Sequence, residues 1–313
     1  MEQKEDCRVL PQEQANESNV FPSGQFSPDV FHENFRLDRK LGKGSYGEVY
    51  LSTHSPTGQQ CVVKKIPKTT PDIHAMALHE AHVGMSVKSP NLCETLAFIE
   101  DKENVFIIME YVAGMDLHDF IVKKPKIFRK VPILLFFVIV KILQGIKDLH
   151  EAGFVHCDIK PENIFIGLSP DQSKITSVKI IDFGLCKPIS KIQGYSGGTI
   201  DYQAPEIAKG TSRDARIDIW SFGITIFAMI MMGLPSCISS KNPDNALRRL
   251  EVLKNLRSLP DDKVFNPFEA LRTNPQIAMI QEFVIRCLTV NPLSRPTSEE
   301  LLQKIREIAP HFK

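Results

Sequence analysis

Hydrophobic residues follow two different periodicities along the chain. Between residues 34 and 112 they occur in short runs separated by turn residues, among them a glycine cluster at residues 42–47 and a Pro-Thr-Gly turn at residues 56–58. Such runs, bounded by glycine and proline, are typical of β-strands joined by tight turns. The pattern predicts three strands, a helix over residues 72–87, and two further strands that end near Val112.

The remainder of the chain has hydrophobic residues at helical spacing, which predicts helices over residues 132–150, 219–232 and 277–288. The change falls at residues 112–117, where Ala113 and Gly114 suit a connector. The predicted fold class is α+β and bilobal. A small antiparallel β-sheet lobe with one helix covers residues 34–112, and a large, mainly α-helical lobe covers residues 113–310.

The first 33 residues are rich in Gln, Glu, Asn, Ser and Pro, and they contain seven acidic residues against two basic ones. Segments of this composition bury too little apolar surface to fold alone. We therefore expect residues 1–33 to form a disordered acidic extension.

Charge and cysteine content narrow the function classes. The chain has 38 basic and 37 acidic residues, so it lacks the overall positive field that binding to nucleic acid or an anionic membrane draws on. Its seven cysteines form no C-x-x-C pair, and the acidic N-terminus does not resemble a signal peptide. These features predict an intracellular protein, cytoplasmic and/or nuclear, with reduced thiols.

Residues 219–240 carry no charge and approach the length of a membrane span. A helix buried on all sides of a large core has the same pattern. We expect the buried helix, because the motifs on either side of this segment require one.

Residues 42–49 read G-x-G-x-x-G-x-V between two predicted strands. Glycines without a Cβ let backbone N–H groups approach phosphate oxygens, but no helix follows directly, so a dinucleotide site is disfavoured. Lys64 ends the next strand, and Glu80 on the following helix is its expected partner; the alternative is a solvated lysine. His79 and His82 flank Glu80 but lack the i, i+4 spacing of a zinc-binding helix.

Two motifs follow downstream, His-Cys-Asp-Ile-Lys-Pro-Glu-Asn at residues 156–163 and Ile-Asp-Phe-Gly at residues 181–184. Together with the glycine loop and Lys64, they resemble the signature set of the protein kinases. The resemblance continues through residues 198–206 and 218–223 and ends with Arg295, so it spans roughly residues 35–308.

This resemblance implies a site for ATP and Mg²⁺. The nucleotide-binding residues that it implies are Leu41, Gly42, Gly44, Gly47, Val49, Lys64, Glu80, Glu110 and Val112. Asp182 and Asn163 are implied to bind Mg²⁺, and Asp158, Lys160 and Asn163 are the implied catalytic residues.

The form of these motifs also implies an acceptor class. Lys160, two residues after Asp158, and the segment at residues 198–202 resemble serine/threonine kinases rather than tyrosine kinases. Asp116 and Glu162 stand where basophilic members keep acids that meet substrate arginines, but an acid at either position is more often simply solvated. Asp218 and a Glu206–Arg295 ion pair are implied to be structural.

Cys157 and Gly84 are among the positions that depart from the family pattern. Cys157 replaces an arginine that grips a phosphate on the activation segment in many kinases, so we expect phosphorylation there to matter little. Gly84 replaces a bulky apolar residue of the helix that carries Glu80. We expect either that Met85 fills the gap, or that the gap is empty and an activating protein partner must press on the helix.

The predicted function is transfer of the ATP γ-phosphate to serine or threonine hydroxyls of protein substrates. Two alternatives use the same fold. A pseudokinase scaffold would have lost one of the key residues, and a small-molecule kinase would lack the Ala-Pro-Glu motif at residues 204–206; neither loss occurs here.

Overall fold

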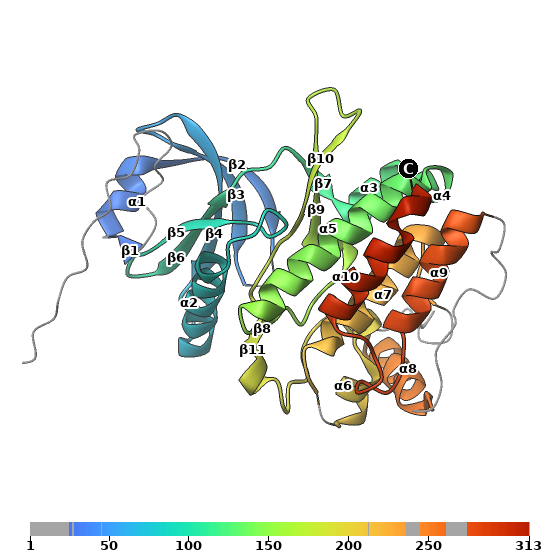
Figure 1. Ribbon diagram of the computed structural model, residues 1–313. Helices are drawn as coiled ribbons and strands as arrows, with labels where there is room; N and C mark the ends of the chain where they lie inside the picture. The colour runs from blue at the N-terminus through green and yellow to red at the C-terminus, as the bar shows by residue number, and fades with distance from the viewer. Residues whose placement is uncertain are drawn as a thin grey trace, which may run out of the picture.

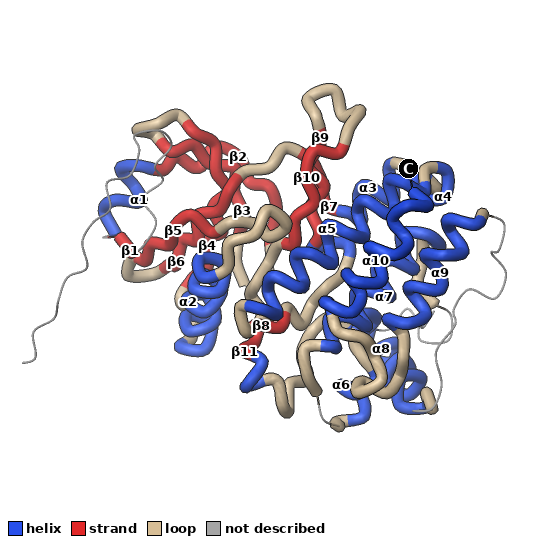
Figure 2. The backbone as a smooth tube through the Cα atoms, viewed as in Figure 1, coloured by secondary structure: helices blue, strands red, loops and turns tan. Residues whose placement is uncertain are grey.

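The computed structural model describes residues 25–312 except residues 27, 45, 212, 236–244 and 261–273. Two lobes lie side by side in Figure 1, a sheet with a helix against it and a larger group of helices. Strands dominate the first lobe and helices the second (Figure 2). The predicted bilobal α+β fold is confirmed, and each predicted helix is present with its ends shifted by at most three residues.

The small lobe is built on a six-stranded sheet with the strand order β1-β5-β6-β4-β3-β2. Its strands are antiparallel except for β1, which pairs parallel with β5. Its elements are β1 (Gln25–Phe26), α1 (Pro28–Asn34), β2 (Phe35–Lys43), β3 (Glu48–His54), β4 (Gln59–Pro67), α2 (Pro71–Ser86), β5 (Thr95–Glu100) and β6 (Asn104–Glu110).

The large lobe begins with β7 (Gly114–Asp116), which pairs with β9 rather than with the small-lobe sheet. The helices that follow are α3 (Leu117–Lys123), α4 (Ile127–Lys130), α5 (Pro132–Glu151), α6 (Pro205–Lys209), α7 (Arg216–Met231), α8 (Asn245–Ser258), α9 (Pro275–Cys287) and α10 (Ser298–Ile308). The short strands are β8 (Phe154–Val155), β9 (Ile164–Leu168), β10 (Ile175–Ile180) and β11 (Lys187–Pro188). Short 3-10 helices cover Pro161–Asn163, Ile189–Lys191, Ile200–Tyr202 and Ala309–Phe312.

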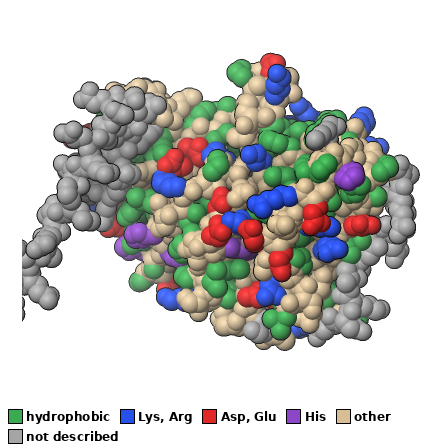
Figure 3. Space-filling view, in the orientation of Figure 1, with side chains coloured by type: hydrophobic (Ala, Val, Ile, Leu, Met, Phe, Trp, Pro, Cys, Tyr) green, Lys and Arg blue, Asp and Glu red, His purple; other side chains and the backbone are tan. Residues whose placement is uncertain are grey.

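Helix α7 is the centre of the large lobe. Every residue from Ile217 to Ile230 is buried, and none of the helices that the structure describes is long and apolar enough to cross a membrane. The uncharged segment is therefore a core helix up to Met231, and residues 236–240 of it lie outside the described residues. On the face of the molecule shown in Figure 3, acidic and basic side chains are interspersed over the large lobe.

The expectation of disorder up to residue 33 is wrong for its last part. Residues 25–26 form β1, and Pro28 opens α1, whose Phe31 is only 2% exposed. The Phe31 ring stacks on Phe106 of β6 with 3.8 Å between centroids, and Phe35 stacks on Phe31 in turn. The Phe31 ring therefore buries apolar surface against two aromatic rings that lie outside residues 1–33, which the composition of that segment could not reveal. Residues 1–24 lie outside the described residues.

Helix α2 carries Glu80, and its start is fixed locally. The hydroxyl of Thr70 accepts a hydrogen bond from Ile73 N at 3.2 Å, and Pro71 occupies the first helical position. Both features favour helix initiation, because the cap satisfies a free N–H and proline needs no partner there.

The space beside Gly84 is filled, and not by Met85. A Cβ at Gly84 would lie 2.0 Å from Thr95 Oγ1 and 3.3 Å from Phe183 Cδ2. Met85 packs instead against the separate apolar cluster between α2 and the sheet. Both expectations for Gly84 are therefore wrong, since Thr95 of β5 takes the place of the missing side chain. The gap that suggested an activating partner does not exist.

A buried ion pair ties the end of residues 182–206, which run from the Asp-Phe-Gly motif to the Ala-Pro-Glu motif and correspond to the activation segment, to the rest of the large lobe. Arg295 Nη1 and Nη2 lie 2.7 Å and 3.0 Å from the two carboxylate oxygens of Glu206, and both side chains are almost fully buried. Arg295 also donates to the backbone oxygens of Thr289, Arg216 and Val290, and its guanidinium lies over the Trp220 ring. The predicted structural pair is present.

We predict that Gly84→Ala destabilises the protein, because the new methyl group overlaps Thr95 of the neighbouring strand. Overpacking costs about 1–3 kcal/mol, against about 1 kcal/mol gained in helix propensity. Urea unfolding should show a lower free energy of unfolding, and a smaller loss when Gly84→Ala is made in a Thr95→Ala background. A stabilised Gly84→Ala variant would contradict the close packing.

We predict that Arg295→Met lowers the free energy of unfolding by about 3–5 kcal/mol, because Glu206 is left as an uncompensated buried charge. Chemical unfolding measures the change. Adding Glu206→Leu should restore only part of the loss, since three backbone oxygens have also lost a donor. Full recovery in the double variant would show that the Arg295 backbone bonds contribute little.

Candidate active site

The glycine loop joins β2 to β3, and the described atoms leave space beside its backbone at Gly42 and Gly44. Gly44 N donates to Gly47 O at 2.8 Å, and a Cβ at Gly47 would lie 2.3 Å from the carbonyl oxygen of Lys65. Only glycine, which has no Cβ, can lie this close to the Lys65 carbonyl oxygen. Among the described atoms, none lies within 4 Å of a Cβ at Gly42, and only Gly47 O, at 3.8 Å, lies near one at Gly44. The loop therefore has room for phosphate oxygens at Gly42 and Gly44.

The other predicted nucleotide contacts lie on β2 and β3, at the end of β6 and at the connector that follows β6. Leu41 is 42% exposed at the end of β2, and Val49 of β3 stands opposite Lys64 of β4 in the antiparallel pair. At the connector, the N–H of Glu110 already donates to Glu94 O at 3.0 Å, so it is not a free donor for adenine. The Glu110 carboxylate pairs with Lys179 at 2.8 Å, and Val112 is half-buried next to it.

Lys64, Glu80 and Asp182 meet where the two lobes join. Lys64 Nζ lies 2.6 Å and 2.8 Å from the two oxygens of Glu80, and 3.1 Å from Asp182 Oδ1. The first two side chains are less than 10% exposed, whereas that of Asp182 is 48% exposed. The structure thus forms the predicted lysine–glutamate pair and extends it to the predicted metal ligand.

The charges of Lys64 and Asp182 support each other, whereas burial raises the pKa of Glu80. Burial works against a charge on Lys64, but the carboxylates of Glu80 and Asp182 outweigh it and raise the pKa of the ammonium group. Burial alone would raise the pKa of Asp182, yet Lys64 beside it holds that pKa below its usual value. At neutral pH the site therefore holds a lysine cation and an ionised Asp182.

Asp158 is held by four hydrogen-bond or ion-pair contacts. Its Oδ1 accepts from Thr199 N at 2.8 Å and from Thr199 Oγ1 at 2.7 Å. Its Oδ2 lies 2.7 Å from Lys160 Nζ and 3.0 Å from Asn163 Nδ2. Burial would raise the pKa of Asp158, but Lys160 and the bonds from Thr199 hold it below its usual value. A carboxylate that stays ionised is suited to accept a hydroxyl proton.

Asp218 of α7 holds the backbone of the loop that carries Asp158. Asp218 is fully buried and accepts from His156 N at 2.7 Å, Cys157 N at 2.8 Å and His150 Nε2 at 2.9 Å. This confirms the structural role predicted for Asp218. Asn163 O accepts from Ile181 N at 2.9 Å, which brings the segment of Asp182 alongside the same loop.

The donor set fits a magnesium ion. Asn163 donates through Nδ2 to both the carbonyl and the carboxylate of Asp158, so no described hydrogen bond uses its amide oxygen. Asp182 uses Oδ1 towards Lys64 and Gly184 N, and it is half exposed. One carboxylate and one amide oxygen, with water and phosphate completing the set, are the ligands that Mg²⁺ prefers.

Some residues of the site were not apparent from the sequence. His79 of α2 donates to the carbonyl oxygen of Cys186, 2.9 Å away, and so ties the helix to the segment after Asp182. His150 belongs to α5 and reaches Asp218 across 68 positions of the chain. No local motif marks either histidine. Asp116, predicted as a possible substrate contact, caps α3 by accepting from Asp119 N at 2.8 Å, and Glu162 is exposed.

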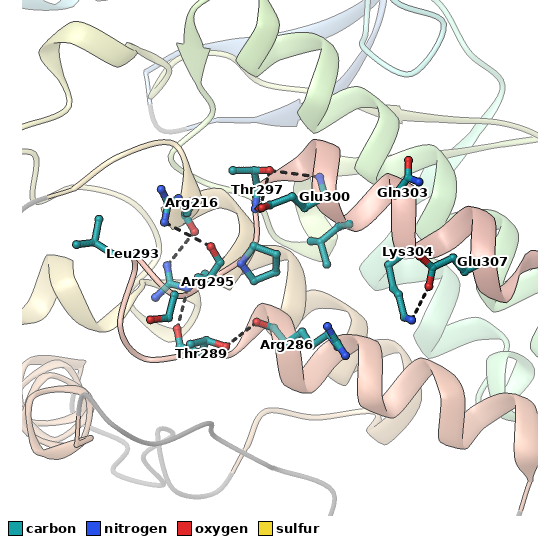
Figure 4. Close-up of a pocket in the computed structure, with 13 residues that line it drawn as sticks. Arg216, Arg286, Thr289, Leu293, Arg295, Thr297, Glu300, Gln303, Lys304 and Glu307 are labelled. Atoms are coloured by element: carbon teal, nitrogen blue, oxygen red, sulfur yellow. Dashed lines mark hydrogen bonds and ion pairs between the residues drawn. The ribbon is translucent and has the colours of Figure 1, made fainter.

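A pocket of about 530 Å³ lies elsewhere in the large lobe, between α9 and α10 (Figure 4). Arg216, Arg286 and Glu300 are among its lining residues, and Lys304 is paired with Glu307 at 2.6 Å. None of the predicted ATP, Mg²⁺ or catalytic residues lines this pocket.

Comparison with known proteins is consistent with this geometry. The protein kinase domain model matches residues 35–305. Calcium-dependent protein kinase 4 of Plasmodium falciparum is 32% identical over 245 residues, which cover 76% of this chain and 45% of that protein. An Aurora kinase of Saccharomyces cerevisiae is 28% identical over 226 residues, covering 71% of this chain and 59% of that protein.

Serine/threonine-protein kinase pakF of Dictyostelium discoideum is 28% identical over 274 residues, covering 87% of this chain but 21% of that protein. The chain thus spans between about a fifth and three fifths of the length of these relatives. Because the kinase match runs through both lobes and contains every residue of the site described above, this chain belongs to the protein kinase family.

Proposed function

We propose that this protein transfers the γ-phosphate of ATP to serine or threonine hydroxyls of protein substrates, with Mg²⁺ as cofactor. One observation carries the proposal. The ionised Asp158, held by Thr199, Lys160 and Asn163, lies in the same structure as an assembled Lys64–Glu80–Asp182 group. A scaffold that only binds nucleotide does not need both the Asp158 contacts and the Lys64–Glu80–Asp182 contacts to be formed.

The residues have distinct parts in the proposed reaction. The glycine loop and Lys64 bind the phosphates, while Glu80 keeps the Lys64 ammonium in position. Asp182 and Asn163 would hold Mg²⁺, which neutralises charge on the β and γ oxygens when bound. Because phosphoryl transfer requires little covalent work from the protein, these contacts act by positioning and by charge stabilisation.

Asp158 would orient the acceptor hydroxyl and take its proton. Lys160 contacts both Asp158 and the hydroxyl of Thr199, at 2.7 Å each, so its ammonium group lies beside the proton acceptor. From there it can stabilise negative charge on the transferred group. The bond between Thr199 and Asp158 ties the activation segment to this centre and supports the assignment to serine/threonine kinases.

We also infer an intracellular location from the chemistry of the thiols. Five cysteines in the described residues are free and buried, and burial raises the pKa of Cys61 and Cys93 to about 12. Thiols of this kind suit a reducing compartment.

We predict that Lys64→Met, Asp158→Asn and Asp182→Asn each abolish nearly all transfer, with Asp158→Asn costing about 10²- to 10⁴-fold. Each removes a charge that acts on the phosphates, the hydroxyl or the metal. Transfer from labelled ATP to peptides measures activity, and circular dichroism confirms that the variants fold. Wild-type rates in Asp182→Asn would show that the assigned metal site is wrong.

We predict that an arrayed peptide library is labelled only on serine and threonine, and only while Mg²⁺ is present. Chelation with EDTA should stop transfer, and excess Mg²⁺ should restore it, because the oxygen donors of Asp182 and Asn163 are the protein's part of the metal site. Labelling of tyrosine peptides would refute the acceptor class. Nucleotide binding without any transfer would favour the pseudokinase alternative.

A further inference from the structure

The residue before the proposed catalytic base carries no charge. Cys157 is 7% exposed and its backbone N–H bonds to Asp218. Burial raises the pKa of the Cys157 thiol far above neutrality, so the side chain stays uncharged. No cation is therefore available at this position to grip a phosphate on the activation segment, and another contact must hold that segment in place.

The ring of Tyr195 supplies one such contact. Tyr195 is partly buried and packs against the large-lobe core, which includes Cys157. A Cβ at Gly197 would lie 2.6–3.0 Å from Oη, Cζ and Cε2 of Tyr195, so the ring rests directly on the Gly197 backbone. Gly198 has φ +88, and a Cβ there would lie 2.6 Å from the carbonyl oxygen of Cys157. Gly197 and Gly198 thus lie between the Tyr195 ring and the loop that carries Cys157 and Asp158.

Gln203 holds the same two glycines from the other end of the segment. Its side chain is 4% exposed, and Nε2 donates to Gly197 O at 2.6 Å and to Gly198 O at 3.3 Å. A buried side-chain amide that donates to two consecutive carbonyl oxygens fixes the backbone there. The next residue is Thr199, whose N–H and hydroxyl both bond to Asp158.

We propose that Tyr195 and Gln203 are positioning residues that clamp Gly197 and Gly198 and thereby hold Thr199 on Asp158 without a phosphate. The inference rests on the proposed kinase function and concerns the regulation of the same site. The segment is ordered by aromatic packing, by the hydrogen bonds of Gln203 and by those of Thr199 to Asp158, where a phosphate bound to a cation would otherwise order it.

The Tyr195 hydroxyl adds no hydrogen bond to the clamp. It is buried and has no hydrogen-bond partner in the described part of the chain. An unpaired buried hydroxyl costs stability, whereas the ring supplies the packing surface. This separates the clamp from any role that requires phosphorylation of the hydroxyl.

Steady-state kinetics with a serine peptide and phosphatase-treated protein tests the proposal. Tyr195→Ala should lower kcat/KM for the peptide about tenfold to 100-fold, and Gln203→Met about tenfold, because Thr199 loses its support. Tyr195→Phe should stay within about twofold of wild type, since only the unpaired hydroxyl is removed. The exposed neighbour Ser196 provides the control Ser196→Ala, which should leave activity unchanged.

Binding of a fluorescent ATP analogue should be the same in all these variants, because neither Tyr195 nor Gln203 contacts the glycine loop. A loss in Tyr195→Phe equal to that in Tyr195→Ala would overturn the proposal, since the hydroxyl or its phosphate would then be required. Wild-type kinetics in Tyr195→Ala would also overturn it. So would a phosphatase-treated wild-type protein that has lost more than about tenfold of its activity.

Hydrogen exchange of residues 189–203 separates this proposal from the proposed function, because it needs no turnover. Exchange should rise in Tyr195→Ala and Gln203→Met and stay low in Tyr195→Phe and Ser196→Ala. If the wild-type protein transfers no phosphate but shows this exchange pattern, the clamp stands and the proposed function fails. Unchanged exchange in Tyr195→Ala overturns the clamp whatever the activity.

Discussion

The arrangement of the site depends on one buried carboxylate, that of Asp218. A fully buried charge is tolerated only when hydrogen bonds compensate it, and Asp218 accepts from two consecutive backbone N–H groups and from His150. These bonds hold His156 and Cys157 while Cys157 adopts a φ of +69 that a non-glycine residue rarely takes. This turn places Asp158 within bonding distance of Thr199, Lys160 and Asn163. Helix α7 can supply this anchor because it is itself buried throughout.

A second set of charges joins the small lobe to this anchored loop. Lys64 of the sheet, Glu80 of α2 and Asp182 of the large lobe share one buried network. The position of α2 is set by packing as well as by charge, because Thr95 and Phe183 lie directly against the bare backbone of Gly84. Glycine at this position therefore brings the helix closer to the sheet than a larger residue would allow.

The large lobe holds two parts of the activation segment by different contacts. At the far end of the activation segment, the fully buried pair of Glu206 and Arg295 fixes one geometry through five hydrogen bonds of the guanidinium. Near Asp158, the segment is held by the Tyr195 ring and the Gln203 amide, and Thr199 bonds to Asp158 and Lys160. None of these contacts depends on an added phosphate, which is consistent with a cysteine beside the proposed catalytic base.

The bilobal fold, the helices and nearly all members of the candidate site could be predicted from the sequence, because they follow from local periodicity and from motifs whose residues are close in the chain. The sequence did not determine the contacts at Gly84, where the neighbour that decides the packing is Thr95 on another element. Composition also gave no sign that Phe31 is buried, because its ring stacks on Phe106 of β6 and on Phe35, both outside residues 1–33. Average composition and local spacing carry no information about such partners. Only the tertiary structure decides them, since it places side chains from distant parts of the chain within van der Waals distance.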